Sequence, residues 1–197
     1  MGFCSGVKRG VDLLEEGMRL GEEKGLPVYT IGPLIHNEAF LDYAKKRGVQ
    51  VIKHPDDTPP GIAVVRAHGI PKSLREAFVS RGFMLLDGTC VRVQRSQHLV
   101  EQFSAEGRTV VIAGDAGHGE VISLMGYCVS PGTCHVVKDA RDLGSISFQS
   151  RVLLLAQTTF SRMHYESIRK ELSSHSAVYG ISDLEVIDSI CPATKSR

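Results

Sequence analysis

Short apolar runs rich in Val, Ile and Leu alternate with longer amphipathic stretches along the chain. Apolar runs of this kind, bounded by glycine, proline or polar clusters, are typical of buried strands in a parallel sheet. Strands are predicted at residues 27–31, 62–65, 83–86, 109–113, 151–155 and 184–187. Apolar residues at helical spacing predict helices at residues 7–18, 36–46, 71–80, 91–106 and 161–173. This alternation predicts an α/β fold with mostly parallel sheets.

One turn-forming pair, Asp87-Gly88 in front of Cys90, suggests a domain boundary. Strands and amphipathic helices are predicted on both sides of it, so we expect two successive small α/β domains, residues 1–89 and 90–190. The predicted first helix begins directly after Cys4, and little follows the last predicted strand. We therefore expect that the chain is cut at both ends.

Composition mainly excludes classes of partner. The chain has 197 residues, of which 42% are hydrophobic, and Lys plus Arg (23) nearly balances Asp plus Glu (22). No global field would therefore draw it to nucleic acid or to an anionic membrane. No apolar run approaches about 18 residues, and no secretory leader is present at the N-terminus. The expected location is the cytoplasm, with no membrane partner.

Residues capable of chemistry follow each predicted strand. The ligand site of an open α/β sheet lies beyond the carboxyl ends of its strands, where turns and helix N-termini gather. The six segments at those positions are Gly32–Asn37, Arg66–Gly69, Asp87–Cys90, Gly117–Glu120, Gln157–Thr159 and Ser189–Cys191. One shared site would explain why every strand delivers a His, Cys, Thr or Glu to the same kind of edge.

Three of the five cysteines stand after a predicted strand or at the start of a predicted helix, namely Cys4, Cys90 and Cys191. They are far apart in sequence and form no local CxxC pair, which disfavours a zinc ribbon or finger and is compatible with an iron–sulfur cluster. Three buried, reduced thiols remain the alternative. Cys128 and Cys134 are interpreted as two incidental thiols in a loop and strand start, and no disulfide framework is expected.

Three histidines, one glutamate and one threonine complete the candidate set. His36, His68 and His118 lie beside Gly, Asn or Pro in strand-end turns, where imidazoles donate hydrogen bonds to an anion such as a diphosphate. Glu120 is able to pass protons, or is only a helix N-terminal charge. Thr158, with its neighbour Thr159, is on local grounds expected to cap the helix that starts near Ser161.

Taken together, these segments resemble the ordered motifs of one family, the 4-hydroxy-3-methylbut-2-enyl diphosphate reductases of the LytB family. The motifs span almost the whole chain and are Gly2–Val7, Gly32–Asn37, Arg66–Gly69, Asp87–Cys90, Gly117–Glu120, Gln157–Thr159 and Ile190–Thr194. Two departures are turn changes, namely Val91 after the middle cysteine and Gly119 between the motif His and Glu, where family members commonly carry Pro. The family's first strand, and a Ser-x-Asn motif and a further Ser beyond Arg197, have no counterpart here.

The resemblance implies a trefoil of three α/β domains around a central [4Fe–4S] cluster, with residues 191–197 beginning the third domain. Cys4, Cys90 and Cys191 would be the cluster ligands and would leave one iron open to the substrate hydroxyl. By motif position, His36, His68 and His118 would bind the diphosphate.

The same resemblance implies the reaction. Glu120 would supply protons, and Thr158 would orient the substrate hydroxyl and the proton relay. A ferredoxin- or flavodoxin-like donor would provide electrons for reductive dehydroxylation to isopentenyl and dimethylallyl diphosphates, in the methylerythritol phosphate pathway of isoprenoid synthesis. Residues 1–197 by themselves are expected to be too incomplete for useful turnover.

The alternative from another class is a non-catalytic diphosphate- or metal-binding fragment of the same fold. A nucleotide-binding Rossmann domain is disfavoured, because no Gly-x-Gly-x-x-Gly follows any predicted strand.

Overall fold

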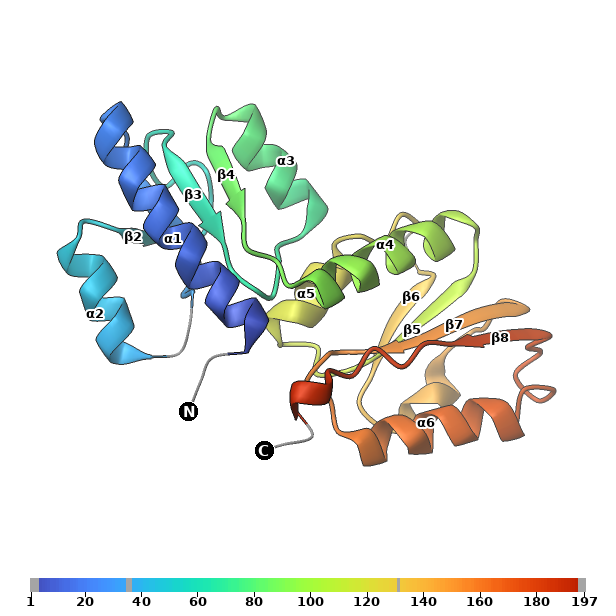
Figure 1. Ribbon diagram of the computed structural model, residues 1–197. Helices are drawn as coiled ribbons and strands as arrows, with labels where there is room; N and C mark the ends of the chain where they lie inside the picture. Colours follow the sequence, from blue (N-terminus) through green and yellow to red (C-terminus); the bar gives the residue numbers. More distant parts are fainter. Residues whose placement is uncertain (1–3, 35–36, 131, 195–197) are drawn as a thin grey trace. The chain divides into compact units, whose positions relative to one another are not determined.

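The structure, a computed structural model, describes residues 4–34, 37–130 and 132–194 (Figure 1). The chain divides into two compact units, Met1–Val91 and Arg92–Arg197, and each contains its own parallel sheet. The predicted α/β class with two successive domains is therefore confirmed. The contacts divide the chain at Val91 rather than at the predicted residue 89, and a separate third segment at 191–197 stays a prediction. Among the described residues, no helix is long and apolar enough to cross a bilayer.

The first unit is a four-stranded sheet with helices on both faces. Its elements are α1 (Ser5–Lys24), β1 (Val28–Ile31), α2 (Glu38–Lys46), β2 (Gln50–Ile52), β3 (Ile62–Val65), α3 (Lys72–Ser80) and β4 (Met84–Asp87). The strands are all parallel and lie in the order β2-β1-β3-β4. Asn37 begins α2 by accepting a hydrogen bond from the amide of Phe40 at 3.0 Å, which satisfies one of the unpaired donors of the first turn.

Alternating side chains of β3 divide the core of this unit into two layers. Val64 packs with Leu14 of α1 and Ala44 of α2 on one face of the sheet. Val65 faces the other side and packs with Phe78 of α3. All four residues of β3 are buried, as the period of two in a central strand with helices on both faces requires.

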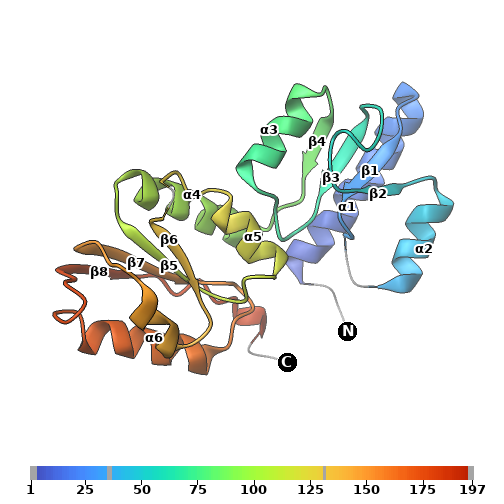
Figure 2. The ribbon, with the colours of Figure 1, turned by 180° about the vertical axis from the view of Figure 1, so that it is seen from behind.

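The second unit repeats this architecture. Its elements are α4 (Val91–Ala105), β5 (Thr109–Ala113), α5 (Gly119–Met125), β6 (Cys134–Val137), the 3₁₀ helix η1 (Ala140–Ser145), β7 (Arg151–Ala156), α6 (Arg162–Ser174), β8 (Asp183–Val186) and the 3₁₀ helix η2 (Pro192–Thr194). The strands are parallel and lie in the order β6-β5-β7-β8. Figure 2 shows α4 and α5 on one face of this sheet and α6 on the other.

Both units have the same strand order, although the sequence shows no repeat. In each sheet the first strand, β1 or β5, leads through a helix to the edge strand beside it, and the third strand, β3 or β7, leads to the opposite edge. The chain therefore leaves β1 and β3, or β5 and β7, in opposite directions. Ligands of open α/β sheets bind at this reversal point, beyond the carboxyl ends of the two strands.

Besides the 3₁₀ helices η1 and η2, three short elements were not among the predicted ones. The edge strands β2 and β6 have three and four residues, and α5 has seven. Such lengths give too few residues for a hydrophobic period to be recognised. Their positions are set instead by backbone pairing to β1 and β5 and by the apolar contacts of Val121 and Leu124 with the sheet.

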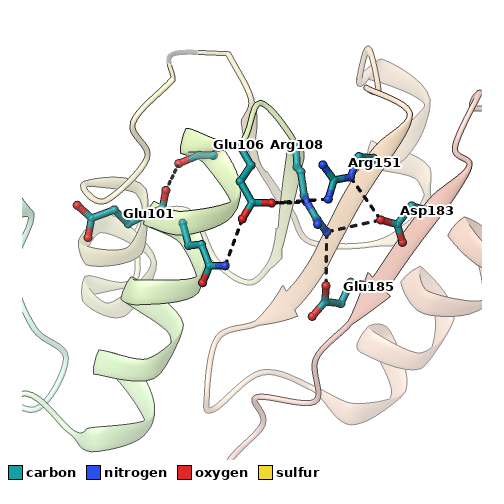
Figure 3. Close-up of polar contacts among 8 residues, drawn as sticks. Glu101, Glu106, Arg108, Arg151, Asp183 and Glu185 are labelled. Carbon is teal, nitrogen blue, oxygen red and sulfur yellow. Dashed lines mark hydrogen bonds and ion pairs between the residues drawn. The ribbon is translucent and has the colours of Figure 1, made fainter.

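The amino-terminal edge of the second sheet carries a network of ion pairs (Figure 3). The guanidinium of Arg108, whose side chain is 11% exposed, lies 2.9 Å from Glu106, 3.6 Å from Asp183 and 3.4 Å from Glu185. Arg151 adds further pairs with Glu106 and Asp183. One nearly buried cation thus contacts three carboxylates, one from the turn after α4 and two from β8, far along the strands from their carboxyl ends.

Replacing Arg108 by methionine is expected to lower the free energy of unfolding by about 1–3 kcal/mol. The change leaves the carboxylates facing one another with only Arg151 for compensation, but their partial exposure moderates the cost. Chemical denaturation measures the effect. Arg169→Met is the matched control, because Arg169 is exposed and pairs only with Glu166 on its own helix, and a change within about 0.5 kcal/mol is expected there. Equal losses in the two variants would contradict the role of the network.

Candidate functional site

The reversal point of the second sheet brings Glu120 and Thr158 together. Glu120 lies in the first turn of α5, after β5, and Thr158 follows β7. The amide of Thr158 donates to Oε1 of Glu120 at 2.7 Å, and the Thr158 hydroxyl donates to Oε2 at 2.6 Å. Both side chains are buried, with 1% and 8% exposure. The threonine therefore holds both carboxylate oxygens of a glutamate that is almost sealed from water.

The local explanation of Thr158 as a helix cap is wrong. The N-cap of α6 is Ser161, whose Oγ accepts from the amide of His164, and Thr158 is occupied by Glu120. Burial raises the pKa of Glu120, because the ionised form loses its hydration, and the two hydrogen bonds from Thr158 offset part of this rise. The carboxyl group thus keeps its proton to a higher pH than an exposed glutamate does.

Cys191 is tied to the same threonine. Its backbone amide donates to the carbonyl oxygen of Thr158 at 2.8 Å. Just before it, the hydroxyl of Ser189 accepts from the amide of Ala156 at 2.8 Å and donates to the carbonyl of Ala156 at 2.6 Å. The segment that carries Cys191 therefore runs beside the end of β7 within the second unit.

His118 stands at the N-cap of α5, two residues before Glu120. Its Nδ1 accepts a hydrogen bond from the amide of Glu120 at 3.2 Å. A neutral imidazole that accepts at Nδ1 carries its proton at Nε2, so His118 presents that ring nitrogen as a donor.

Gln157 was quoted within a motif but given no role by the sequence. Its Oε1 accepts from the amide of Asp115 at 3.1 Å, and its Nε2 donates to the hydroxyl of Thr159 at 2.8 Å. The amide side chain is buried and therefore braces the loop after β5 against the loop after β7. A glutamine directly after a fully apolar strand is the sequence signal that would have suggested such a role.

In the first unit, Cys4 and Cys90 both lie at the first turn of α1. Cys4 is the N-cap of this helix and is exposed. The sulfur of Cys90, which follows β4, lies only 3.2 Å from the place that a Cβ on Gly6 would take. The amide of Cys90 donates to the carbonyl of Ala67 at 3.0 Å, which fixes the residue beside the turn after β3. The Cys90 thiol thus lies beside the first turn of α1, the helix whose N-cap is Cys4.

His68 lies in that turn, which is closed by a hydrogen bond of 2.9 Å from the amide of Gly69 to the carbonyl of Arg66. The next strand end is braced by Asp87, whose Oδ1 accepts from the amide and hydroxyl of Thr89 at 3.0 and 2.5 Å. His36, the remaining histidine of the predicted set, lies outside the described residues.

The two remaining cysteines form a disulfide, Cys128–Cys134, so their interpretation as incidental thiols is wrong. The end of α5 and the start of β6 bring them together across a short loop, with Cα atoms 6.3 Å apart, within the range that a disulfide requires. Cys4, Cys90 and Cys191 are not disulfide-bonded. Among the described residues, no three His, Cys, Asp or Glu side chains are gathered closely enough to hold a single metal ion.

Comparison with known proteins identifies the family. The family model described as LytB protein matches residues 1–197. The chain belongs to the LytB family. Curated relatives named 4-hydroxy-3-methylbut-2-enyl diphosphate reductase are 38% identical in Treponema denticola and 36% identical in Aquifex aeolicus. Each alignment covers the whole of this chain, and 69% and 65% of the respective relative.

Solved structures agree. A structure of (E)-4-hydroxy-3-methyl-but-2-enyl diphosphate reductase, described as the terminal enzyme of the non-mevalonate pathway, superimposes with a TM-score of 0.84 at 34% identity. It covers all of this chain, which corresponds to 67% of that protein. The Plasmodium falciparum E-1-hydroxy-2-methyl-but-2-enyl-4-diphosphate reductase gives 0.85 at 28% identity, over 98% of this chain and 59% of that one. The predicted family of this LytB chain is confirmed, and the chain spans about two thirds of the length of its relatives.

Substituting Thr158 by valine in this LytB chain is expected to raise the pKa of Glu120 further, because the carboxylate loses a hydroxyl donor that favours its ionised form. At pH values above the Glu120 pKa the buried carboxylate would then destabilise the fold by about 1–3 kcal/mol. As the pH falls and Glu120 becomes protonated in both proteins, the difference should disappear.

Carbon-13 NMR of the glutamate carboxyl groups, together with unfolding curves at several pH values, measures both effects. Thr159→Val is the control, since Thr159 is exposed and its hydroxyl bonds to Gln157 instead. A Glu120 pKa that does not move in the Thr158 variant would show that the hydroxyl bond has no influence on the carboxyl group.

Proposed function

We propose that the chain is the larger part of a 4-hydroxy-3-methylbut-2-enyl diphosphate reductase, an oxidoreductase of isoprenoid synthesis. Family membership supports this activity, and one structural observation carries it. The buried carboxyl group of Glu120, the hydroxyl of Thr158 and the backbone of Cys191 form one connected arrangement at the reversal point of the second sheet. A proton source is thereby connected through a single threonine to a cysteine that is not disulfide-bonded.

The reaction needs protons as well as electrons. An allylic alcohol that loses its hydroxyl takes up two electrons and two protons and releases water. Glu120 is suited to deliver a proton, because burial raises its pKa and the acid form therefore persists to a higher pH than in an exposed glutamate. The Thr158 hydroxyl, 2.6 Å from Oε2, lies in position to pass that proton on and to orient a substrate hydroxyl.

Cys4, Cys90 and Cys191 are proposed to ligate the iron–sulfur cluster. Their donor chemistry fits, since none of the three cysteines is disulfide-bonded and all three are partly or fully exposed at strand or helix ends. The absence of a side chain at Gly6 also leaves room beside the Cys90 sulfur. When bound, a [4Fe–4S] cluster with three thiolate ligands supplies electrons singly and one open, Lewis-acidic iron.

Imidazoles are proposed to bind the diphosphate. His118 presents Nε2 as a donor because Nδ1 is occupied by the amide of Glu120, and His68 lies in the turn after β3. His36 completes the proposed set by motif position. A ferredoxin- or flavodoxin-like protein would deliver the electrons, and the cytoplasm is the proposed location.

The proposal is tested by anaerobic reconstitution of residues 1–197 with iron and sulfide. We expect bound iron and inorganic sulfide near four each per chain, with broad visible absorbance. Turnover of the allylic diphosphate with a strong one-electron reductant is then measured on this chain extended at both ends to the length of its relatives. Bound cluster without turnover in the extended protein would favour the non-catalytic diphosphate- or metal-binding alternative. If neither residues 1–197 nor the extended chain takes up iron, the proposal of an iron–sulfur cluster is wrong.

A further inference from the structure

The reversal point of the first sheet is occupied by Arg66, a residue to which neither the motifs nor the proposed reaction assign a task. Arg66 follows β3 directly and is the first residue of the turn that carries His68. Its guanidinium lies against Gly32, which follows β1. β1 and β3 are the neighbouring strands from which the chain departs in opposite directions, so this arginine stands where open α/β sheets bind ligands.

The guanidinium of Arg66 lies beside Gly32. The position of a Cβ built on Gly32 is 3.4 Å from Nη1, 3.5 Å from Cζ and 3.7 Å from Nε, so the three atoms of the plane are nearly equidistant from it. Gly32 also has a φ of 71°, which strains any residue with a side chain. Glycine therefore permits the turn beside which the guanidinium lies.

Arg66 is half-buried, and no described carboxylate neutralises its charge. Its Nε is buried and has no hydrogen-bond partner in that part of the chain. Desolvation lowers the pKa of Arg66, and no described carboxylate offsets this loss. Arg108, by contrast, is nearly buried and faces three carboxylates. Buried cations in proteins are normally paired, because an unpaired one loses its hydration and gains nothing in return.

We propose that Arg66 binds phosphate oxygens of an anionic ligand at the carboxyl edge of the first sheet. The planar guanidinium presents adjacent N–H donors that match two oxygens of one phosphate group. The inference rests on the proposed function for the choice of a diphosphate. It extends that function, since it adds a permanent cation to imidazoles that are charged only at lower pH.

The test uses residues 1–197 and inorganic pyrophosphate as the probe, at pH 8 and constant ionic strength. We expect the Nε–H resonance of Arg66 to shift during an NMR titration. Arg66→Met should weaken pyrophosphate binding by about tenfold to a hundredfold, as calorimetry would measure, because a charge-assisted pair is lost. Arg66→Lys, which keeps the charge but not the fork, should fall between.

Arg19→Met is the matched control, since it removes one exposed positive charge from the same unit and should leave the affinity within about twofold. The proposal is overturned if the parent chain does not bind pyrophosphate, if Arg66→Met binds it as tightly as the parent, or if Arg19→Met weakens binding equally. If Arg66→Met does not fold, the Arg66→Lys affinity and the parent Nε–H shift decide. No iron or turnover enters this test, so its failure is distinguishable from failure of the proposed reaction.

Discussion

Replacing Glu120 by glutamine is expected to reduce turnover by about 10²- to 10⁴-fold while iron content and stability stay near those of the parent protein. The amide keeps the shape of the buried carboxyl group. Its oxygen can still accept from the Thr158 amide, and its NH₂ can donate to the Thr158 hydroxyl in place of the present bond. What is lost is the transferable proton. Steady-state kinetics of this chain extended to family length, beside iron analysis and thermal unfolding, measure the three quantities.

The pH profile sharpens this experiment. Because burial raises the pKa of Glu120, the acid form should persist to higher pH than an ordinary glutamate allows, and turnover should fall as the pH rises through that pKa. The remaining activity of the glutamine variant should lack this step. Glu166→Gln removes an exposed carboxylate from α6 and should change neither the rate nor the profile. Full activity of the Glu120 variant would remove this residue from the mechanism.

The sequence was sufficient to predict the central strands and the long helices. β3, β5 and β7 are apolar runs because both of their faces are covered by helices, and this makes them visible without any tertiary information. The edge strands β2 and β6 and the helix α5 could not be predicted in this way. β2 has only one buried residue of three, so its conformation depends on pairing with β1 rather than on its own pattern.

The candidate site was predictable in its residue types but not in its contacts. The rule that ligands bind at the carboxyl ends of strands identified Glu120 and Thr158 separately. Their hydrogen bonds join residues 38 positions apart, and only the pairing of β5 with β7 brings the two loops together. Local reasoning preferred a capping role for Thr158 because it considers only the nearest helix.

Two features had no usable signal in the sequence. The Cys128–Cys134 disulfide joins thiols whose approach depends on how α5 ends and β6 begins, and both elements were too short to predict. Arg66 looked like any turn arginine. The proposed role of Arg66 follows from a half-buried guanidinium that no described carboxylate neutralises, and this is visible only in the folded chain.

Replacing Cys90 by alanine is expected to abolish turnover and to remove most of the bound iron. Cys90 is a free thiol, its backbone is fixed to Ala67, and its sulfur borders the helix turn that Cys4 opens. Alanine removes the thiolate without disturbing that backbone bond. Because the side chain is small and only partly buried, the free energy of unfolding of the iron-free chain should change by less than about 1.5 kcal/mol. Loss of iron would therefore report loss of a ligand rather than loss of the fold.

The disulfide supplies a matched control for this cysteine. Cys134→Ala also removes one sulfur from the chain, but that sulfur is bonded to Cys128 and is not available as a thiolate. After anaerobic reconstitution, the Cys134 variant should retain the parent's iron and sulfide, whereas the Cys90 variant should retain little of either. The Cys134 variant should also have a lower free energy of unfolding than the parent, since the cross-link is lost and Cys134 is buried. The two variants thus separate ligand loss from structural loss. Iron retained by the Cys90 variant, or lost equally from both variants, would show that this thiol is not a cluster ligand.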